Sequence, residues 1–385
     1  MLKSPLAPYL YWAKTRPAAE FDLAGSNLLA ATLDDLPGAR DAVELTAPDR
    51  GGFPPLVEAI GAHYGVASDR VVTALGCSAA NFLAIGALVG PGDSVLMESP
   101  GYDQISGACE LLGARVETFG RRFEDGYRVD VDAIRSRITE STRLVIITSP
   151  HNPSGMAADR ATLLALQSMA EAADVHVLVD EVYLDVTNMV HAPPGLAPRT
   201  LPRAGGRYSP AALVGDRLLS ISSLTKSYGL SGLRCGWVIT TPKLAERVRR
   251  VRDVIDNIGA APADRIAALA FGHLDQLAAR AHALVSTNLE LTRKFFARNP
   301  NLELAGPIEA TIAFPRMSGL TDTGPFVDRL FAEQSVAVAA GRFFGAPSHI
   351  RLSLAGRTDM LAEGLARMER LMFNYSVSTG GGSRV

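Results

Sequence analysis

The sequence predicts an α/β protein whose large domain holds a mostly parallel sheet between layers of helices, with a smaller α+β domain beside it. Three observations support this fold class. Between residues 70 and 240, short β-rich runs alternate with helical stretches, the order expected of a parallel sheet with helices packed around it. These runs are continuously apolar rather than alternating, which indicates strands buried on both faces. Beyond about residue 243 long helices dominate, and a short mixed region of helices and strands closes the chain.

The individual elements follow in order along the chain. An amphipathic helix is predicted over residues 56–65, where it ends at a glycine. Seven apolar runs predict the strands of the sheet, at 70–76, 94–99, 114–119, 142–150, 175–182, 217–224 and 233–240. Helices are expected between them at 78–89, 102–113 and 159–173. Two long helices then follow, at 242–256 and 263–299. The last strand candidates are 310–317, 336–341 and 349–356.

The composition excludes several classes of protein. With 47% hydrophobic and 20% charged residues among 385, this is an ordinary globular sequence, long enough for two domains. A formal net charge of -2 gives no electrostatic reason to expect nucleic acid or an anionic membrane as a partner. No apolar run approaches the ~20 residues of a membrane span, and the first residues lack a signal-peptide core. Three scattered cysteines predict neither a disulfide framework nor a metal site, so we expect a cytoplasmic protein.

Chemically distinctive segments follow the ends of the predicted strands. In an α/β sheet, ligands bind beyond the carboxyl ends of the strands. Five strand ends carry such segments, at 76–78, 100–102, 149–155, 180–183 and 222–226. We therefore expect these segments to meet around one ligand.

Three stretches of the chain resemble the signatures of the fold-type I pyridoxal-phosphate enzymes, specifically the class I/II aminotransferases. They are SPHNPSG at 149–155, VDEVYLD at 179–185 and SSLTKSYGLSGLRCGW at 222–237. The resemblance extends over roughly residues 45–360, in the family's order and spacing. It implies an aspartate aminotransferase-like fold, pyridoxal 5'-phosphate as cofactor, and a homodimer that acts on an amino acid and a 2-oxo acid.

The resemblance also implies how the chain divides. A large cofactor-binding domain is expected over residues 40–250. A small domain would combine the N-terminal segment, 1–39, with the C-terminal third, 251–375. The glycine-rich end, 376–385, is expected to be a flexible tail.

The same resemblance assigns the central chemistry to Lys226. This lysine would carry the cofactor's aldehyde as a Schiff base and would then move the α-proton of the substrate. To act near neutral pH, its pKa must be lowered by desolvation and by a positive charge such as that of Arg234. Asp180 would keep the cofactor's ring nitrogen protonated, and Tyr102 would stack on the ring. The predicted catalytic residues are therefore Lys226, Asp180 and Tyr102.

Further residues would hold the cofactor. Asn152 and Tyr183 would hydrogen-bond to its phenolic oxygen. Its phosphate would lie at the start of a helix, against Ser78 and the amides of Cys77 and Ala79. Ser223 and Arg234 match the family's other phosphate ligands. The complete predicted cofactor set is Cys77, Ser78, Ala79, Tyr102, Asn152, Asp180, Tyr183, Ser223, Lys226 and Arg234.

The predicted substrate contacts lie near the two ends of the chain. By resemblance, Arg351 in HIRLSLAG would bind the α-carboxylate of the amino acid, and Asn152 would also contact the substrate. Gly25 in FDLAGSN matches a segment whose backbone lies beside the substrate. Three aromatic residues precede it, and we interpret them as part of a packed amphipathic helix rather than as a substrate clamp. They are Tyr9, Tyr11 and Trp12.

Two positions depart from the family pattern. Many relatives carry a tyrosine that reaches the phosphate of the neighbouring subunit, and alignment on the turn GGFPPL places Ala47 there. Relatives that act on dicarboxylic amino acids read the side chain with a second arginine. The comparable stretch here offers Asn257 and Ile258, with no arginine before Arg265. An acidic substrate is therefore less favoured, and an apolar, aromatic or basic side chain stays open.

The resemblance leaves the outcome of the reaction open. We expect transfer of the amino group of an L-amino acid to a 2-oxo acid through Lys226. A lyase or cyclase of amino-acid or specialised metabolism would show the same motifs, because the carbanion common to these enzymes can also lose a substituent or cyclise. A DNA-binding regulator that borrows this fold is disfavoured, since no basic module precedes the family-like region. An inactive relative is disfavoured because the cofactor positions are filled except at residue 47.

Overall fold

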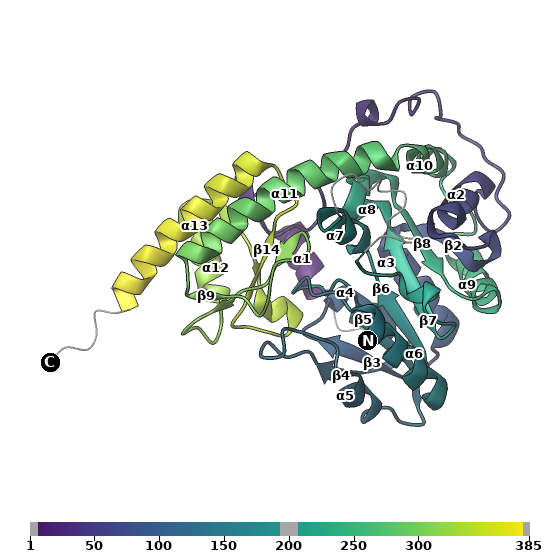
Figure 1. Ribbon diagram of the computed structural model, residues 1–385, viewed down its shortest axis with the longest axis horizontal. Helices are drawn as coiled ribbons and strands as arrows, with labels where there is room; N and C mark the ends of the chain where they lie inside the picture. Colours follow the sequence, from purple (N-terminus) through teal and green to yellow (C-terminus); the bar gives the residue numbers. More distant parts are fainter. Residues whose placement is uncertain (1–6, 193–206, 380–385) are drawn as a thin grey trace.

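The predicted seven-stranded sheet is present in the computed structural model, which describes residues 7–192 and 207–379 (Figure 1). Its strands are β2 (Val71–Leu75), β3 (Ser94–Ser99), β4 (Arg115–Gly120), β5 (Thr142–Thr148), β6 (His176–Asp180), β7 (Leu218–Ser223) and β8 (Cys235–Ile239). Their order in the sheet is β2-β8-β7-β6-β5-β3-β4. Strand β8 runs antiparallel to both neighbours, and the other pairs are parallel. The mostly parallel sheet is thus confirmed.

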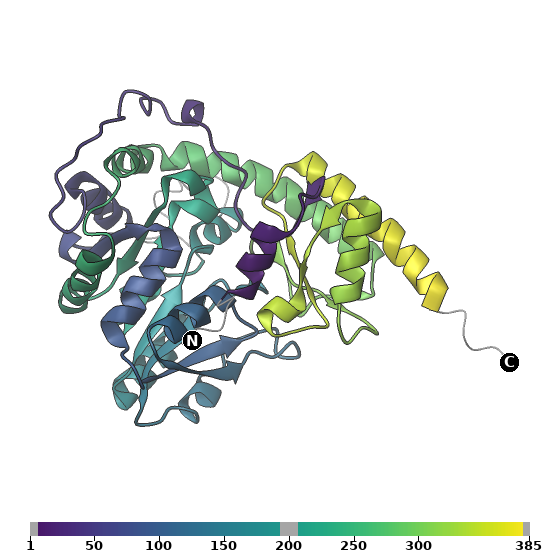
Figure 2. The same ribbon diagram turned by 180° about the vertical axis from the view of Figure 1, so that it is seen from behind.

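Helices cover both faces of this sheet (Figures 1 and 2). They are α2 (Pro54–Tyr64), α3 (Gly76–Leu88), α4 (Asp103–Leu111), α5 (Val131–Arg135), α6 (Arg160–Ala173), α7 (Leu184–Val190), α8 (Leu224–Tyr228) and α9 (Pro242–Ile255). The side chains of a strand point alternately to the two faces. In β5, Ile146 packs in a core cluster with Leu83 of α3, whereas Val145 and Ile147 share another cluster with Leu163 of α6. This two-sided burial explains why the strand runs are continuously apolar.

The long helix predicted over 263–299 is wrong, because two helices form there instead. Helix α10 covers Ala261–Gly272 and α11 covers Leu274–Arg298, and they meet at His273, whose φ of -115 and ψ of 13 are not helical. The adjoining glycine, Gly272, is a poor helix former, which makes this point of the chain easy to bend. The bend lets α10 pack against α2, while α11 continues past α7 and α8 (Figure 1).

The N-terminal segment joins the C-terminal third of the chain. Strand β1 (Phe21–Asp22) pairs in parallel with β12 (Val336–Ala337). The candidate strands of this part form only as short pieces: β9 (Leu302–Glu303), β10 (Ile312–Ala313), β11 (Arg316–Met317), β13 (Ala339–Ala340) and β14 (Ile350–Ser353). Helices α1 (Pro8–Thr15), α12 (Gly324–Gln334) and α13 (Thr358–Thr379) complete it. The domain boundaries at 40 and 250 stay a prediction.

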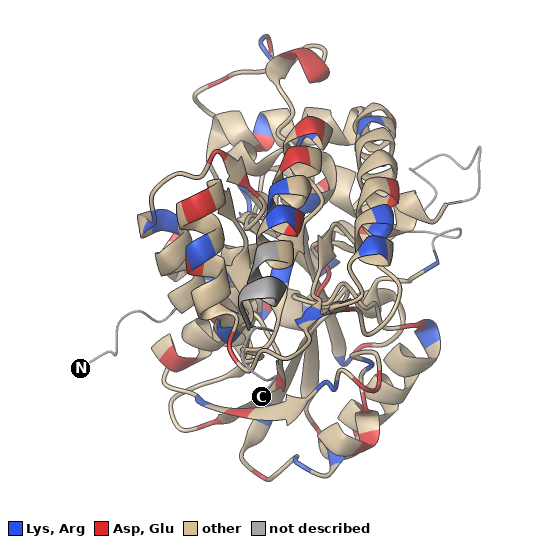
Figure 3. Cartoon of the chain, turned by 90° about the vertical axis from the view of Figure 1, so that its left-hand side faces the viewer, with Lys and Arg blue, Asp and Glu red and all other residues tan. Residues whose placement is uncertain are grey.

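Helix α13 bears on the predicted flexible tail. It continues to Thr379, so the tail predicted from residue 376 begins inside a helix. The remaining residues of that tail, 380–385, lie outside the described residues. None of the helices within the described ranges is long and apolar enough to cross a membrane. On the side drawn in Figure 3, basic and acidic residues are interspersed along the helices, in keeping with the balanced charge of the sequence.

Candidate active site

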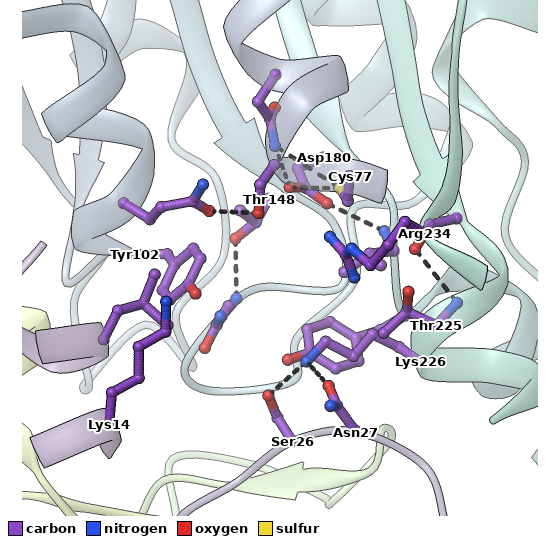
Figure 4. Close-up of a pocket in the computed structure, with 18 residues that line it drawn as sticks. Lys14, Ser26, Asn27, Cys77, Tyr102, Thr148, Asp180, Thr225, Lys226 and Arg234 are labelled. Carbon is purple, nitrogen blue, oxygen red and sulfur yellow. Dashed lines mark hydrogen bonds between the residues drawn. The ribbon is translucent and has the colours of Figure 1, made fainter. Parts of the chain in front are cut away.

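A cavity of about 370 Å³ opens at the carboxyl ends of the sheet strands (Figure 4). Helix α3 begins there directly after β2, and β5, β6 and β7 end there at Thr148, Asp180 and Ser223. Nine of the residues predicted to bind the cofactor line it: Cys77, Ser78, Tyr102, Asn152, Asp180, Tyr183, Ser223, Lys226 and Arg234. Three other predicted residues lie outside this lining, namely Ala79, Gly25 and Arg351. Separate strand ends therefore do converge on one pocket.

The amine of Lys226 lies inside this pocket. It donates hydrogen bonds to Ser26 Oγ at 2.9 Å and to Asn27 Oδ1 at 2.6 Å. Burial, and then the positive charge of Arg351, lower the pKa of Lys226 to about 7. Arg234 contributes in the same direction but less, so the larger of the two cationic effects comes from Arg351. A large fraction of this amine is neutral near pH 7 and can react with a carbonyl group.

The local fold fixes the position of Lys226. The side chain of Ser223 caps the short helix α8 by accepting a hydrogen bond from Thr225 N at 3.3 Å. The helix ends at Gly229, which has a φ of 75°. A Cβ atom there would stand 2.5 Å from Leu29 O, so the chain needs glycine at this turn. Ser223 and Gly229 thus fix the two ends of α8, and Lys226 reaches the pocket from the last turn of this helix.

The carboxyl group of Asp180 is held by three neutral donors. Asn81 Nδ2 donates at 2.8 Å and Cys77 Sγ at 3.2 Å to Oδ2, and Val182 N donates at 3.1 Å to Oδ1. Burial raises the pKa of Asp180, although these hydrogen bonds oppose the shift. The expected cofactor carries a protonated ring nitrogen. Beside Asp180, its positive charge would favour the ionised form of the carboxyl group.

The turn between β2 and α3 suits an anion. The N-cap residue Leu75 provides no side-chain cap to α3 within the described structure, so the amides of the first turn are available to a ligand. Gly76 has a φ of +81°, and a Cβ atom there would lie 2.3 Å from Arg234 Nη2. Ser78 Oγ donates to Gln104 Oε1 at 3.0 Å. Because residue 76 is glycine, the guanidinium of Arg234 can approach the turn where an anion would bind.

The guanidinium of Arg351 is fully buried beside the pocket. It donates to Asn152 Oδ1 at 3.0 Å, to Tyr9 OH at 2.5 Å and to Ala24 O at 2.9 Å. It also lies 4.6 Å from the centre of the Tyr9 ring and 4.7 Å from that of Phe344. No ion pair with a carboxylate is found for Arg351 among the described residues. No carboxylate in the part of the chain that the structure describes therefore neutralises its positive charge.

Tyr9 is thus more than the packed aromatic that the sequence indicated. It is buried, and its hydroxyl donates to Ala24 O at 2.8 Å while it contacts Arg351. Tyr11, by contrast, is 59% exposed. A Cβ atom added at Gly25 would meet nothing within 4 Å beyond its neighbours in the chain, so its role as a close-approach residue stays a prediction.

Replacing Tyr9 by phenylalanine should weaken substrate binding rather than chemistry. The change removes a hydrogen bond to a charged group and leaves the ring in place. We expect KM for the amino acid to rise about fivefold to tenfold, with kcat changed less than about threefold. Steady-state kinetics would measure both constants. The exposed Tyr11→Phe variant is the control, and an unchanged KM in Tyr9→Phe would contradict the assignment.

A buried network supports the loop that carries Asn152. Thr148 Oγ1 accepts from Asn152 N at 2.8 Å and donates to Glu98 Oε1 at 2.5 Å. Glu98 forms a fully buried ion pair with Arg121 at 2.8 Å. His151 is buried with its Nε2 at 2.9 Å from Pro100 O, and burial lowers its pKa. These contacts hold His151 inside the buried network.

Glu181, the neighbour of Asp180, should make stability depend on pH. Burial raises its pKa to about 8, from 4.5, while its Oε1 accepts from Ala211 N at 2.6 Å. The folded protein therefore holds a proton between pH 4.5 and 8 that the unfolded chain releases, and stability falls as pH rises through this window. In Glu181→Gln that loss should disappear. The unfolding free energy of the unmodified protein, minus that of Glu181→Gln, should therefore fall by about 1 kcal/mol for each pH unit of increase. Urea unfolding of both proteins at about pH 5.5 and pH 7.5 tests this, and parallel pH profiles would contradict it.

The positions that depart from the family pattern lie away from the cavity. Ala47 packs half-buried against the main core cluster. Arg265 donates to Thr46 O at 3.1 Å. Neither Asn257 nor Ile258 is among the residues that line the cavity in the described structure. These residues give no second arginine to the pocket.

Several polar groups of the site could not be recognised from the sequence. Ser26 and Asn27, which bind Lys226, follow the predicted Gly25 directly. Asn81 lies one turn after Cys77 in a mostly apolar helix. Its amide among apolar residues was the only sign in the sequence that it belongs to the site. Thr148 lies near the end of the predicted strand at 142–150, and Thr225 lies in the motif at 222–237, directly before Lys226. The remaining ones show no comparable signal, because their role depends on contacts between distant segments. They are Tyr9, Lys14 and Gln104.

Comparison with known proteins identifies the family. Residues 33–368 match the family model "Aminotransferase class I and II". The chain belongs to this family. It is 31% identical to capreomycidine synthase of Streptomyces vinaceus, over 94% of this chain and 92% of that protein. It is also 31% identical to the arginine–pyruvate transaminase AruH of Pseudomonas aeruginosa, over 79% of this chain and 75% of that one.

The solved structures agree on the fold. The crystal structure of aspartate aminotransferase from Thermotoga maritima superimposes with a TM-score of 0.79 at 23% identity. The alignment covers 95% of each chain. The aspartate aminotransferase-like fold expected from the signatures is therefore confirmed.

The class I/II aminotransferases use pyridoxal phosphate, and the pocket fits this cofactor. An amine with a lowered pKa faces the same cavity as a buried carboxyl group held by neutral donors. An uncapped helix start and Arg234 provide a place for a phosphate. In this arrangement Lys226 would bond to the cofactor, Asp180 would contact its ring nitrogen, and Tyr102 would lie against its ring.

Proposed function

We propose that this protein is a pyridoxal-phosphate-dependent aminotransferase, which transfers the amino group of an L-amino acid to a 2-oxo acid. The observation that carries the proposal is Lys226, whose pKa of about 7 arises in a pocket that Asp180 and Asn152 also line, with Arg351 donating to Asn152 from behind. When bound, the cofactor supplies an electron sink that makes the α-proton of the amino acid removable. The residues around it decide which groups are held and where the proton goes.

The roles of these residues follow from their contacts. Arg351 would hold the α-carboxylate, oriented by Asn152 and Tyr9. The amine of the substrate would replace Lys226 on the cofactor and free that amine to take the α-proton. Tyr183, whose pKa is raised to about 12 chiefly by burial, keeps its proton and can donate to the phenolic oxygen of the cofactor.

We propose that two copies of the chain form the working enzyme. Large apolar side chains are exposed on the loop before α2 and around the end of α9: Leu45 at 86%, Val254 at 82%, and Ile255 and Ile258 at 56% each. Such residues are common in subunit interfaces. Analytical ultracentrifugation should give the mass of two chains, and Val254→Asp should shift it toward one. A single-chain mass for the unmodified protein would refute the homodimer. A cytoplasmic location likewise stays a prediction.

A second candidate function is a cyclase of the same fold. It is favoured by the 31% identity to capreomycidine synthase, which extends over nearly the whole of both chains. The residues that hold the cofactor would be the same. The two candidates differ in what happens after the α-proton has left, because only a transaminase keeps the amino group on the cofactor.

The stoichiometry of a half-reaction separates the two candidates. The holoenzyme is mixed with single amino acids and no 2-oxo acid, and the products are followed by mass spectrometry. A transaminase should release about one 2-oxo acid per subunit and stop, with loss of the cofactor's visible absorbance, until an oxo acid is added. Continuous turnover without an acceptor would reject the aminotransferase and support the cyclase.

A further inference from the structure

All but one of the charged groups that line the pocket in the described structure have a counterpart in the proposed reaction. Lys226 would bond to the cofactor, Asp180 would interact with its ring nitrogen and Arg234 would bind its phosphate. Lys14, from helix α1, also lines the cavity and has no such counterpart. It is exposed, and no hydrogen bond or ion pair of its amine is found in the part of the chain that the structure describes.

Lys14 and Tyr102 are drawn on the same side of the pocket, opposite Arg234 (Figure 4). Lys14 is therefore away from the position proposed for the cofactor's phosphate. Leu10, four residues earlier in the same helix, also lines the cavity. Residues four apart share one face of a helix, so α1 presents an apolar group followed by a cation to the same space.

Helix α1 is firmly attached to the substrate-binding arginine. Tyr9 N donates to Asp103 Oδ2 at 2.6 Å, and the Tyr9 ring lies 5.5 Å from that of Phe344. The hydroxyl of Tyr9 contacts Arg351 directly. Arg351, which would bind the α-carboxylate, is therefore in direct contact with the helix that carries Lys14.

We propose that Lys14 binds an anionic group at the end of the substrate's side chain, so that the enzyme selects acidic over basic amino acids. The inference rests on the proposed function, because it places the α-carboxylate at Arg351. Leu10 would pack against the methylene groups between the two carboxylates. The sequence disfavoured an acidic substrate because the family's second arginine is missing, and Lys14 supplies a cation from a different element. A guanidinium side chain would meet like charge at this position.

Binding of unreactive acids tests the proposal without any turnover. Calorimetry on the holoenzyme would compare glutarate with pentanoate, which has the same chain length and one carboxylate. Glutarate should bind at least about tenfold more tightly to the unmodified enzyme. Lys14→Met keeps the length of the side chain and should abolish this preference. Lys243→Met, at an exposed lysine of α9, is the matched control and should retain it.

Kinetics with reactive amino acids provide the second measurement. Lys14→Met should lower kcat/KM for L-glutamate or L-aspartate by about 10- to 100-fold and leave L-glutamine within about threefold. Lys14→Glu should raise the relative activity toward L-arginine. Equal binding of glutarate and pentanoate, or a glutarate preference that survives Lys14→Met, would overturn the inference. Turnover without an acceptor, with the binding preference intact, would refute only the aminotransferase.

Discussion

Replacing Lys226 with alanine should lower turnover by at least about 10⁴-fold with every amino acid that the enzyme accepts. Two functions are lost together, because the same amine would bond to the cofactor and move the α-proton. The surrounding contacts adapt this amine to both functions. Ser26 and Asn27 orient this amine, and burial with Arg351 lowers its pKa to about 7. Steady-state assays with the cofactor in excess measure the loss.

Two further variants separate chemistry from charge at this position. Lys226→Arg keeps a cation in the pocket but cannot lose its proton near neutral pH, so it should be as inactive as the alanine variant. Lys243→Ala, on the surface of α9, should leave activity unchanged. Borohydride treatment of the unmodified holoenzyme should attach the cofactor irreversibly to the peptide that contains Lys226. Finding that peptide unmodified, with cofactor in excess, would contradict the assignment.

Replacing Asp180 with asparagine should lower kcat by about 10²- to 10⁴-fold while the cofactor still binds. Asparagine has nearly the same shape and loses the negative charge. The buried carboxyl is held by Asn81, Cys77 and the Val182 amide, all of which are neutral. Without the charge, protonation of the cofactor's ring nitrogen is no longer favoured, and the electron sink weakens. Rapid mixing with the amino acid would measure the rate of the half-reaction.

Cys77 offers a control for this prediction. Cys77→Ser retains a donor toward Asp180 and should keep kcat within about fivefold. A larger loss in Cys77→Ser than in Asp180→Asn would show that the donor set, and not the charge, controls the rate. Cofactor affinity should be measured for both variants, since a loss of binding alone would lower activity for a different reason.

Much of the fold and the pocket could be predicted, because both depend on short apolar runs and on the residues that directly follow them. Each strand of the sheet appears in the sequence as an apolar run, and the residues that follow it must lie at one edge when the strands are parallel. For this reason Asp180, Ser223 and Lys226 could be placed together from the sequence. The break at His273 could not, because a single glycine inside a helical pattern is often tolerated.

The amino-acid sequence by itself determined the alternation of strands and helices, the family, and the residues at the strand ends. The tertiary structure alone decided which distant segments complete the pocket. Tyr9 and Arg351 are 342 positions apart, and both donate to Ala24 O, whose neighbour Leu23 is hydrogen-bonded to Ser353 at the end of β14. Lys14 enters the cavity through the same docking of the N-terminal segment. Such contacts follow from how separate elements pack, and no local pattern of residues encodes them.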